Sequence, residues 1–201
     1  MKESGWQTIS SERHFANSHL EVVTDQVQTP ARPDPRAWTI VHRKAAVVIA
    51  PLTGDGKVIL IRQERIPIRQ AIWEMPSGQI DSVAGEGDSG SKSETIERVA
   101  LRELREETGY ELAKNGELIP LGYYFTSAGF TDERGYLFLA RPVQPCEEGP
   151  AREEGESILD CREFTAEEIR RMIAENEIRD ANTLGICAML AARGLLSLRS
   201  L

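Results

Sequence analysis

The sequence lacks the features of a secreted or membrane-spanning protein. No apolar run approaches the ~20 residues that a transmembrane helix needs, and the N-terminal stretch MKESGWQTISSERHF has no apolar core of a signal peptide. It has only three cysteines, an odd number without the spacing of a metal site: Cys146, Cys161 and Cys187. These absences predict a cytoplasmic protein with reduced thiols and no membrane partner.

Positive charge is also in short supply. The chain has 24 lysines and arginines against 32 aspartates and glutamates, a formal net charge of −8. This balance argues against a surface that binds nucleic acid, so any phosphate-bearing ligand is expected to be small and neutralised locally. A chain of 201 residues with 40% hydrophobic content can form one sizeable core with a small appendage.

The pattern of segments predicts two domains, a β-rich N-terminal piece over residues 1–44 and a main domain over residues 45–201. In the first, residues 20–27 and 38–41 are expected to be extended, with a break between them at Pro30, Pro33 and Pro35. The main domain mixes strands and helices, which predicts an α+β or α/β/α sandwich.

Strands in the main domain are expected over residues 45–51, 57–63, 72–75, 118–126 and 136–140, with a hairpin turn at 53–56 and an exposed acidic connection at 147–156. Thr165 with Glu168 has the pattern of a capping box at the start of a helix. Asp180 is expected to cap a last helix that ends before Gly194.

The most informative stretch is ETIERVALRELREETGY, residues 94–110. At about 100° per residue, one helical face carries the apolar side chains Ile96, Val99, Ala100 and Leu104, together with Glu103, Glu106 and Glu107. The arginines 98, 102 and 105 point the opposite way. Acids on the core-facing side need compensation, and an oxygen-rich cluster suits Mg²⁺ or Mn²⁺.

The alternative is a charged surface helix with its own salt bridges, such as Glu94 to Arg98 and Arg102 to Glu106. In either case the helix is expected to start with a capping box of Ser91 and Glu94, or with Ser93 as its N-cap. Gly109 is expected to end it in the left-handed conformation.

Glu94, seven further residues and then Arg102-Glu103-Leu104-Arg105-Glu106-Glu107-Thr108-Gly109 resemble the signature of the Nudix hydrolases. Gly78, in WEMPSGQID, takes the place of the opening glycine, but fifteen residues instead of five separate it from Glu94. The ten extra residues, 82–91, are rich in glycine and serine and are interpreted as a solvated loop that includes Glu86 and Asp88. Tyr110 stands where the signature has an aliphatic residue.

Within that superfamily the chain is most similar to the ADP-ribose and nucleoside-diphosphate-sugar pyrophosphatases, through VILIRQERIPI, IWEMPSGQID and YYFTSAGFTDER. The resemblance implies a Nudix-type α/β/α sandwich with a mixed sheet. In this group a loop after the signature helix carries a suggested catalytic base, and Glu133 takes that place. Ala128 replaces the proline of that loop. Without the resemblance, Glu133 would be interpreted as a surface acid beside Asp132 and Arg134.

The resemblance also implies a metal site for Mg²⁺, with Mn²⁺ as an alternative. The ligands would be Glu103, Glu107, Glu106 and the backbone carbonyl of Ser77, and Glu107 would count as catalytic too. Glu94, Arg102 and Gly109 are interpreted as structural members of the motif, with Arg102 pointing away from the acids of the metal site, pairing with a carboxylate and bracing the helix.

Arg65 matches an arginine that contacts the diphosphate in related enzymes, and Gly78 is expected beside the substrate. The alternative for Arg65 is a salt bridge with Glu64 or Glu74, while Arg69 and Arg62 are secondary candidates. A base is expected to stack on Trp38 or Phe15, with Trp6 as a further candidate. Packing of these aromatic side chains in a core or an interface is the alternative.

The expected activity is hydrolysis of ADP-ribose or a related nucleoside diphosphate sugar to a nucleoside monophosphate and a sugar phosphate. A nucleoside triphosphate pyrophosphohydrolase and a non-catalytic Nudix-fold sensor remain as alternatives. The N-terminal piece is too small for a core of its own. Because similar enzymes exchange such strands between subunits, where they help complete each active site, we expect a homodimer with shared sites.

Overall fold

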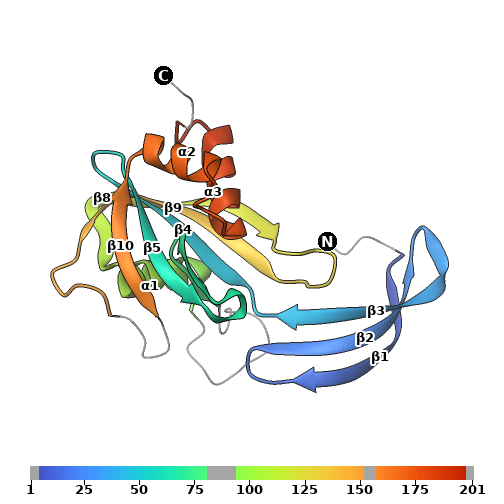
Figure 1. The fold of residues 1–201 in the computed structure, drawn as a ribbon. Coiled ribbons are helices and arrows are strands. Elements are labelled where there is room, and N and C mark those ends of the chain that lie inside the picture. Colours follow the sequence, from blue (N-terminus) through green and yellow to red (C-terminus); the bar gives the residue numbers. More distant parts are fainter. Residues whose placement is uncertain (1–4, 81–93, 152–156, 198–201) are drawn as a thin grey trace. The chain divides into compact units, whose positions relative to one another are not determined.

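The chain divides into two units (Figure 1). A computed structural model describes residues 5–80, 94–151 and 157–197. The first unit comprises the N-terminal residues up to Ala45 together with residues 125–134, and the second comprises residues 46–124 and 135–201. The predicted insertion at 82–91, with Glu86 and Asp88, lies outside the described residues.

The first unit is built on a three-stranded antiparallel sheet in the order β1-β2-β3. Its strands are β1 (Gln7–Ala16), β2 (Leu20–Thr29) and β3 (Arg32–Arg43). The expected extended stretches at 20–27 and 38–41 are confirmed. The predicted break at three prolines is wrong in part, because Pro33 and Pro35 lie inside β3. Proline is tolerated there because β3 is an edge strand of this sheet.

Residues 125–134 pack on β3, although they follow β8 in the chain. The amide of Val41 donates to the carbonyl of Phe130 at 2.8 Å, and the indole of Trp38 donates to the carbonyl of Gly129 at 3.2 Å. Val41 and Thr131 also form a parallel bridge. This loop, with its GFTDE sequence, is therefore held by the N-terminal sheet.

The second unit contains a seven-stranded sheet with the central order β10-β5-β4-β9-β8. In addition, β6 pairs with β5, and β7 pairs with β4. Because β4 runs parallel to β9 and antiparallel to β7, the sheet is mixed, as predicted. The strands are β4 (Ala46–Thr53), β5 (Val58–Arg65), β6 (Gln70–Glu74), β7 (Ser77–Gln79), β8 (Tyr110–Phe125), β9 (Arg134–Pro145) and β10 (Ile158–Phe164).

Helices cover both faces of this sheet at β4. Val48, Ala50 and Leu52 belong to a buried cluster with side chains of α2 (Ala166–Ala174) and α3 (Ala181–Ala192) (Figure 1). Val47 and Ile49 alternate to the opposite face, and α1 (Ile96–Glu103) also contacts β4. Burial on two faces explains the continuous apolar run of this strand. The α/β/α sandwich is confirmed.

Helix ends follow their predicted caps with one exception. Thr165 and Glu168 form the expected capping box, and Asp180 accepts a hydrogen bond from the amide of Thr183 at 2.7 Å. The cap predicted for α1 is wrong, because Thr95 is its N-cap and accepts from the amide of Arg98. Ser91 and Ser93 precede it, outside the described residues. None of the described helices is long and apolar enough to cross a membrane.

Candidate functional site

The signature helix turns two carboxylates into the protein. It consists of α1 followed by a π-helical turn, η2 (Leu104–Thr108), that ends at Gly109 with φ 74° and ψ 19°, as predicted. Leu104 is fully buried, and Glu103 and Glu107 are only 6% and 1% exposed. The surface-helix alternative is therefore wrong for these two acids.

Both carboxylates lie against strand β7. The amide of Ser77 donates to Oε2 of Glu107 at 2.7 Å. A side chain at Gly78 would collide with the carboxylate of Glu103, because that group lies directly over the Gly78 backbone. Only glycine leaves room for such a close approach. The predicted proximity of Ser77 and Gly78 to the acids is thus a feature of the structure.

Arg102 contacts the acids of the motif. Its guanidinium lies 3.0 Å from Glu103 Oε1, 2.8 Å from Glu106 Oε2 and 3.4 Å from Glu94 Oε2. The expectation that Arg102 points away from the acids is wrong, because its long side chain reaches around the helix. Burial acts to lower the pKa of Arg102, but the charges of Glu103 and the other two acids outweigh it and raise that pKa.

Two buried carboxylates, on Glu103 and Glu107, and a third on the partly buried Glu106 are oxygen donors of the kind that hard divalent cations prefer. Within the described residues, no three histidine, cysteine, aspartate or glutamate side chains are arranged so that they could hold a metal ion. Arg102 and the Ser77 amide bind the carboxylate oxygens instead. A bound divalent ion would offset negative charge on a substrate and lower the pKa of a bound water.

Glu133 is buried in the first unit and is only 9% exposed. Nη1 of Arg43 lies 3.1 Å from one of its carboxylate oxygens, and the hydroxyl of Thr126 donates to the other at 2.8 Å. The neighbouring Asp132 pairs with His42 at 2.7 Å. The surface-acid alternative for Glu133 is therefore wrong. No local signal in the sequence predicts Arg43 as its partner, because 90 positions separate the two residues.

Arg65 forms a salt bridge with Glu74, which was one of the two partners in the alternative interpretation of this residue. Its Nε and Nη2 donate to the carboxylate of Glu74 at 3.0 and 2.9 Å. Burial raises the pKa of Glu74, and Arg65 offsets this only in part. Glu64 instead accepts from the hydroxyl of Ser157 at 2.5 Å. Arg65 also lines an open pocket of about 280 Å³ at the β5–β6 turn, together with Arg69 and Gln70.

The three aromatic candidates lie in the N-terminal unit with more than half of their surface exposed. Trp38 is 54% exposed, Phe15 is 51% exposed and Trp6 is 56% exposed. Packing in the core of a single chain is therefore excluded as their role. Stacking on a base and packing in an interface are the interpretations that remain.

Comparisons with known proteins identify the family of the chain. The NUDIX domain matches residues 41–184. The chain is 32% identical over 183 residues to the ADP-ribose pyrophosphatase of Bacillus subtilis (strain 168), which covers 91% of each protein. It is also 32% identical over 178 residues to the methanol dehydrogenase activator of Bacillus methanolicus, covering 89% of this chain and 88% of that protein.

A crystal structure of an ADP compounds hydrolase has the same fold. It superposes with a TM-score of 0.73 at 17% sequence identity, and the match covers 96% of this chain and 98% of the other. The fold is therefore shared even where the sequences have diverged. With the domain match and the relatives that align over nearly the whole length, the chain belongs to the Nudix family.

Proposed function

We propose that the protein is a Mg²⁺- or Mn²⁺-dependent Nudix hydrolase that acts in the cytoplasm on ADP-ribose or a related nucleoside diphosphate sugar. The products are a nucleoside monophosphate and a sugar phosphate. The observation that carries this proposal is the burial of Glu103 and Glu107 against Ser77 and Gly78. It is supported by the similarity to an ADP-ribose pyrophosphatase over nearly the whole chain and by the general dependence of Nudix hydrolases on divalent metal.

In this proposal Glu103, Glu106, Glu107 and the carbonyl of Ser77 hold the metal. Arg102 keeps the carboxylates of Glu103 and Glu106 in place through its two ion pairs. Hydrolysis of a diphosphate spreads negative charge over the oxygens of both phosphates, which a divalent ion stabilises. Two carboxylates that are nearly inaccessible to water in the protein alone suit this task better than surface acids.

Substrate binding is assigned to Arg65, Gly78, Trp38 and Phe15. Arg65 uses Nε and Nη2 on Glu74, and Nη1 has no hydrogen-bond partner among the described residues. We assign Nη1 to the binding of a phosphate oxygen of the substrate, because a guanidinium can donate to two acceptors at once. The exposed rings of Trp38 and Phe15 offer faces on which a base can stack.

Glu133 is proposed as the base that takes a proton from the attacking water. Arg43 and Thr126 hold its carboxylate in one orientation, which a general base requires. Trp38 and His42 tie the surrounding loop to β3.

The substrate class is tested by incubating the protein with ADP-ribose, other nucleoside diphosphate sugars and nucleoside triphosphates, each with Mg²⁺ or Mn²⁺. We expect inorganic phosphate from ADP-ribose only after a phosphatase is added, because both products are phosphate monoesters. Direct release of pyrophosphate from a triphosphate would instead favour a triphosphate pyrophosphohydrolase. Tight binding of these compounds without any product would favour a sensor.

The metal site is tested by Glu107→Gln. The substitution keeps an oxygen that can accept from the Ser77 amide, so the fold should persist, but the negative charge on a metal ligand is lost. We expect kcat to fall by about 100-fold or more, measured with saturating Mg²⁺. Glu97→Gln is the matched control, because Glu97 is an exposed acid on the same helix. Equal activity of the two variants would remove Glu107 from the site.

The proposed base is tested by Glu133→Gln, with Glu12→Gln, at an exposed acid on β1 of the same unit, as the control. Loss of a general base should lower kcat by about 10²–10⁴-fold with little change in KM, measured by steady-state kinetics. The control should retain kcat within tenfold or so. If Glu133→Gln lost activity through a higher KM alone, Glu133 would be a structural partner of Arg43 and not the base.

We also propose a homodimer that forms through the N-terminal sheet. The proposal rests on Trp6, Phe15 and Trp38, which expose large apolar surfaces in the single chain. Light scattering after gel filtration at micromolar concentration should give twice the monomer mass of 22.4 kDa. Substituting Phe15 and Trp38 by serine should shift the protein towards the monomer, whereas a wild-type protein of monomer mass would contradict the proposal.

A further inference from the structure

The signature helix, here also called the catalytic helix, ends in an unusual turn, and residues of other elements contact the chain at that end. Glu106 and Glu107 lie in the π-helical turn η2, a conformation that is rare in proteins and frequently occurs at functional sites. Two cysteines of other segments contact backbone carbonyls at the end of this turn. The amide of Cys146 donates to the carbonyl of Gly109 at 2.8 Å, and the thiol of Cys161 lies 3.8 Å from the carbonyl of Thr108.

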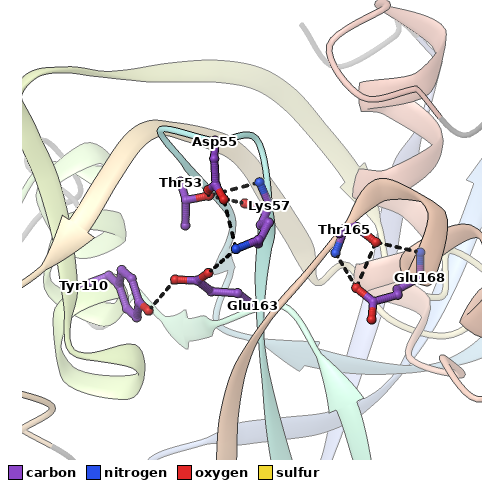
Figure 2. Close-up of polar contacts among 7 residues, drawn as sticks. All are labelled: Thr53, Asp55, Lys57, Tyr110, Glu163, Thr165 and Glu168. Carbon is purple, nitrogen blue, oxygen red and sulfur yellow. Dashed lines mark hydrogen bonds and ion pairs between the residues drawn. The ribbon is translucent and has the colours of Figure 1, made fainter.

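Tyr110, the next residue, adds a side-chain contact at the same end. Figure 2 shows its hydroxyl donating to Oε1 of Glu163 on β10, at 3.0 Å. The other oxygen of Glu163 accepts from Lys57 Nζ at 3.2 Å, and Lys57 also pairs with Asp55 at 2.9 Å (Figure 2). A continuous row of polar contacts therefore connects the β4–β5 turn, strand β10 and the end of the catalytic helix.

The surroundings keep the tyrosine hydroxyl protonated and therefore able to donate. Burial and the hydrogen bond to Glu163 raise the pKa of Tyr110 to about 12. The hydrogen bonds and charges of Asp55 and Glu163 also raise the pKa of Lys57, so that its ammonium group stays charged. The direction of both shifts favours the hydrogen-bonded arrangement over the whole physiological range of pH.

An aliphatic side chain, which the Nudix signature has at this position, cannot make this contact. Tyr110 follows Glu107 by three positions, so a shift of the helix end would move the Glu107 carboxylate relative to its partner, the Ser77 amide. Hydrogen bonds that involve a charged partner are among the stronger ones in proteins. The Tyr110–Glu163 contact is thus a restraint that this chain adds to the metal-binding turn.

We propose that Tyr110 is a positioning residue whose hydrogen bond to Glu163 holds the η2 turn in the register that presents Glu107 to the metal. The expected effect of this hydrogen bond on metal affinity rests on the proposed metal site. Its effect on the turn itself does not depend on which substrate the enzyme cleaves.

The test compares Tyr110→Phe with Glu168→Ala. Glu168 belongs to the capping box of α2, which is drawn beside the Tyr110 contacts in Figure 2, and its carboxylate accepts from the amide and the hydroxyl of Thr165. Each substitution removes one side-chain hydrogen-bonding group, so each should lower the melting temperature by about 2–4 °C. The two variants are therefore expected to lose similar stability, but they differ in where the contact is lost.

We expect only Tyr110→Phe to weaken Mn²⁺ binding, by about three- to tenfold in the dissociation constant measured by calorimetry. In the metal-free protein, the amides of residues 104–109 should exchange with deuterium faster in Tyr110→Phe than in Glu168→Ala. Glu163→Gln keeps an acceptor for the tyrosine and should bind Mn²⁺ within about twofold of the wild type. Glu163→Ala should behave like Tyr110→Phe.

Wild-type Mn²⁺ affinity together with unchanged exchange in Tyr110→Phe would overturn the proposal. An equal loss of affinity in Glu168→Ala would also overturn it, because the effect would then be general destabilisation. A wild-type protein that does not bind Mn²⁺ would contradict both the positioning role and the metal site. A protein that binds Mn²⁺ but cleaves no nucleoside diphosphate sugar would contradict the proposed function and leave the role of Tyr110 standing.

Discussion

The burial of two like-charged carboxylates against one strand governs the rest of this structure. Removing an ionised carboxylate from water costs several kcal/mol even after the protein relaxes. Glu103 and Glu107 nevertheless lie inside, between the signature helix and β7. Arg102 and the Ser77 amide offset part of this cost, and glycine at position 78 leaves room for the first carboxylate. A divalent cation bound beside these acids would add further compensation.

The residues proposed for catalysis are divided between the two units. The second unit holds the acidic helix, Arg65 and the network around Tyr110, whereas the first holds Glu133 with its partner Arg43. In the first unit the N-terminal sheet fixes the loop that carries Glu133. The N-terminal strands therefore have a role inside one chain, in addition to the subunit contact proposed for their exposed aromatic side chains.

Local patterns in the sequence predicted much of the fold and the inner face of the helix. The helical spacing of Val99, Ala100 and Leu104 placed Glu103 and Glu107 in the interior, and the cap at Thr165 followed from its neighbours in the chain. Partners distant in sequence had no such signal, as in the pair Arg43–Glu133. Strand β10 was missed because only its first residue is buried, which leaves no regular alternation. The contacts of Arg102 depend on a flexible side chain that a helical projection does not describe.

The inward-facing acids are proposed to form a divalent-metal site. The most direct test of this proposal is a crystal grown with Mn²⁺ and a non-hydrolysable ADP-ribose analogue, with data collected near the manganese absorption edge. We expect an anomalous peak within coordination distance of the carboxylates of Glu103 and Glu107 and of the Ser77 carbonyl. A map that shows bound analogue without a peak beside these acids would contradict it.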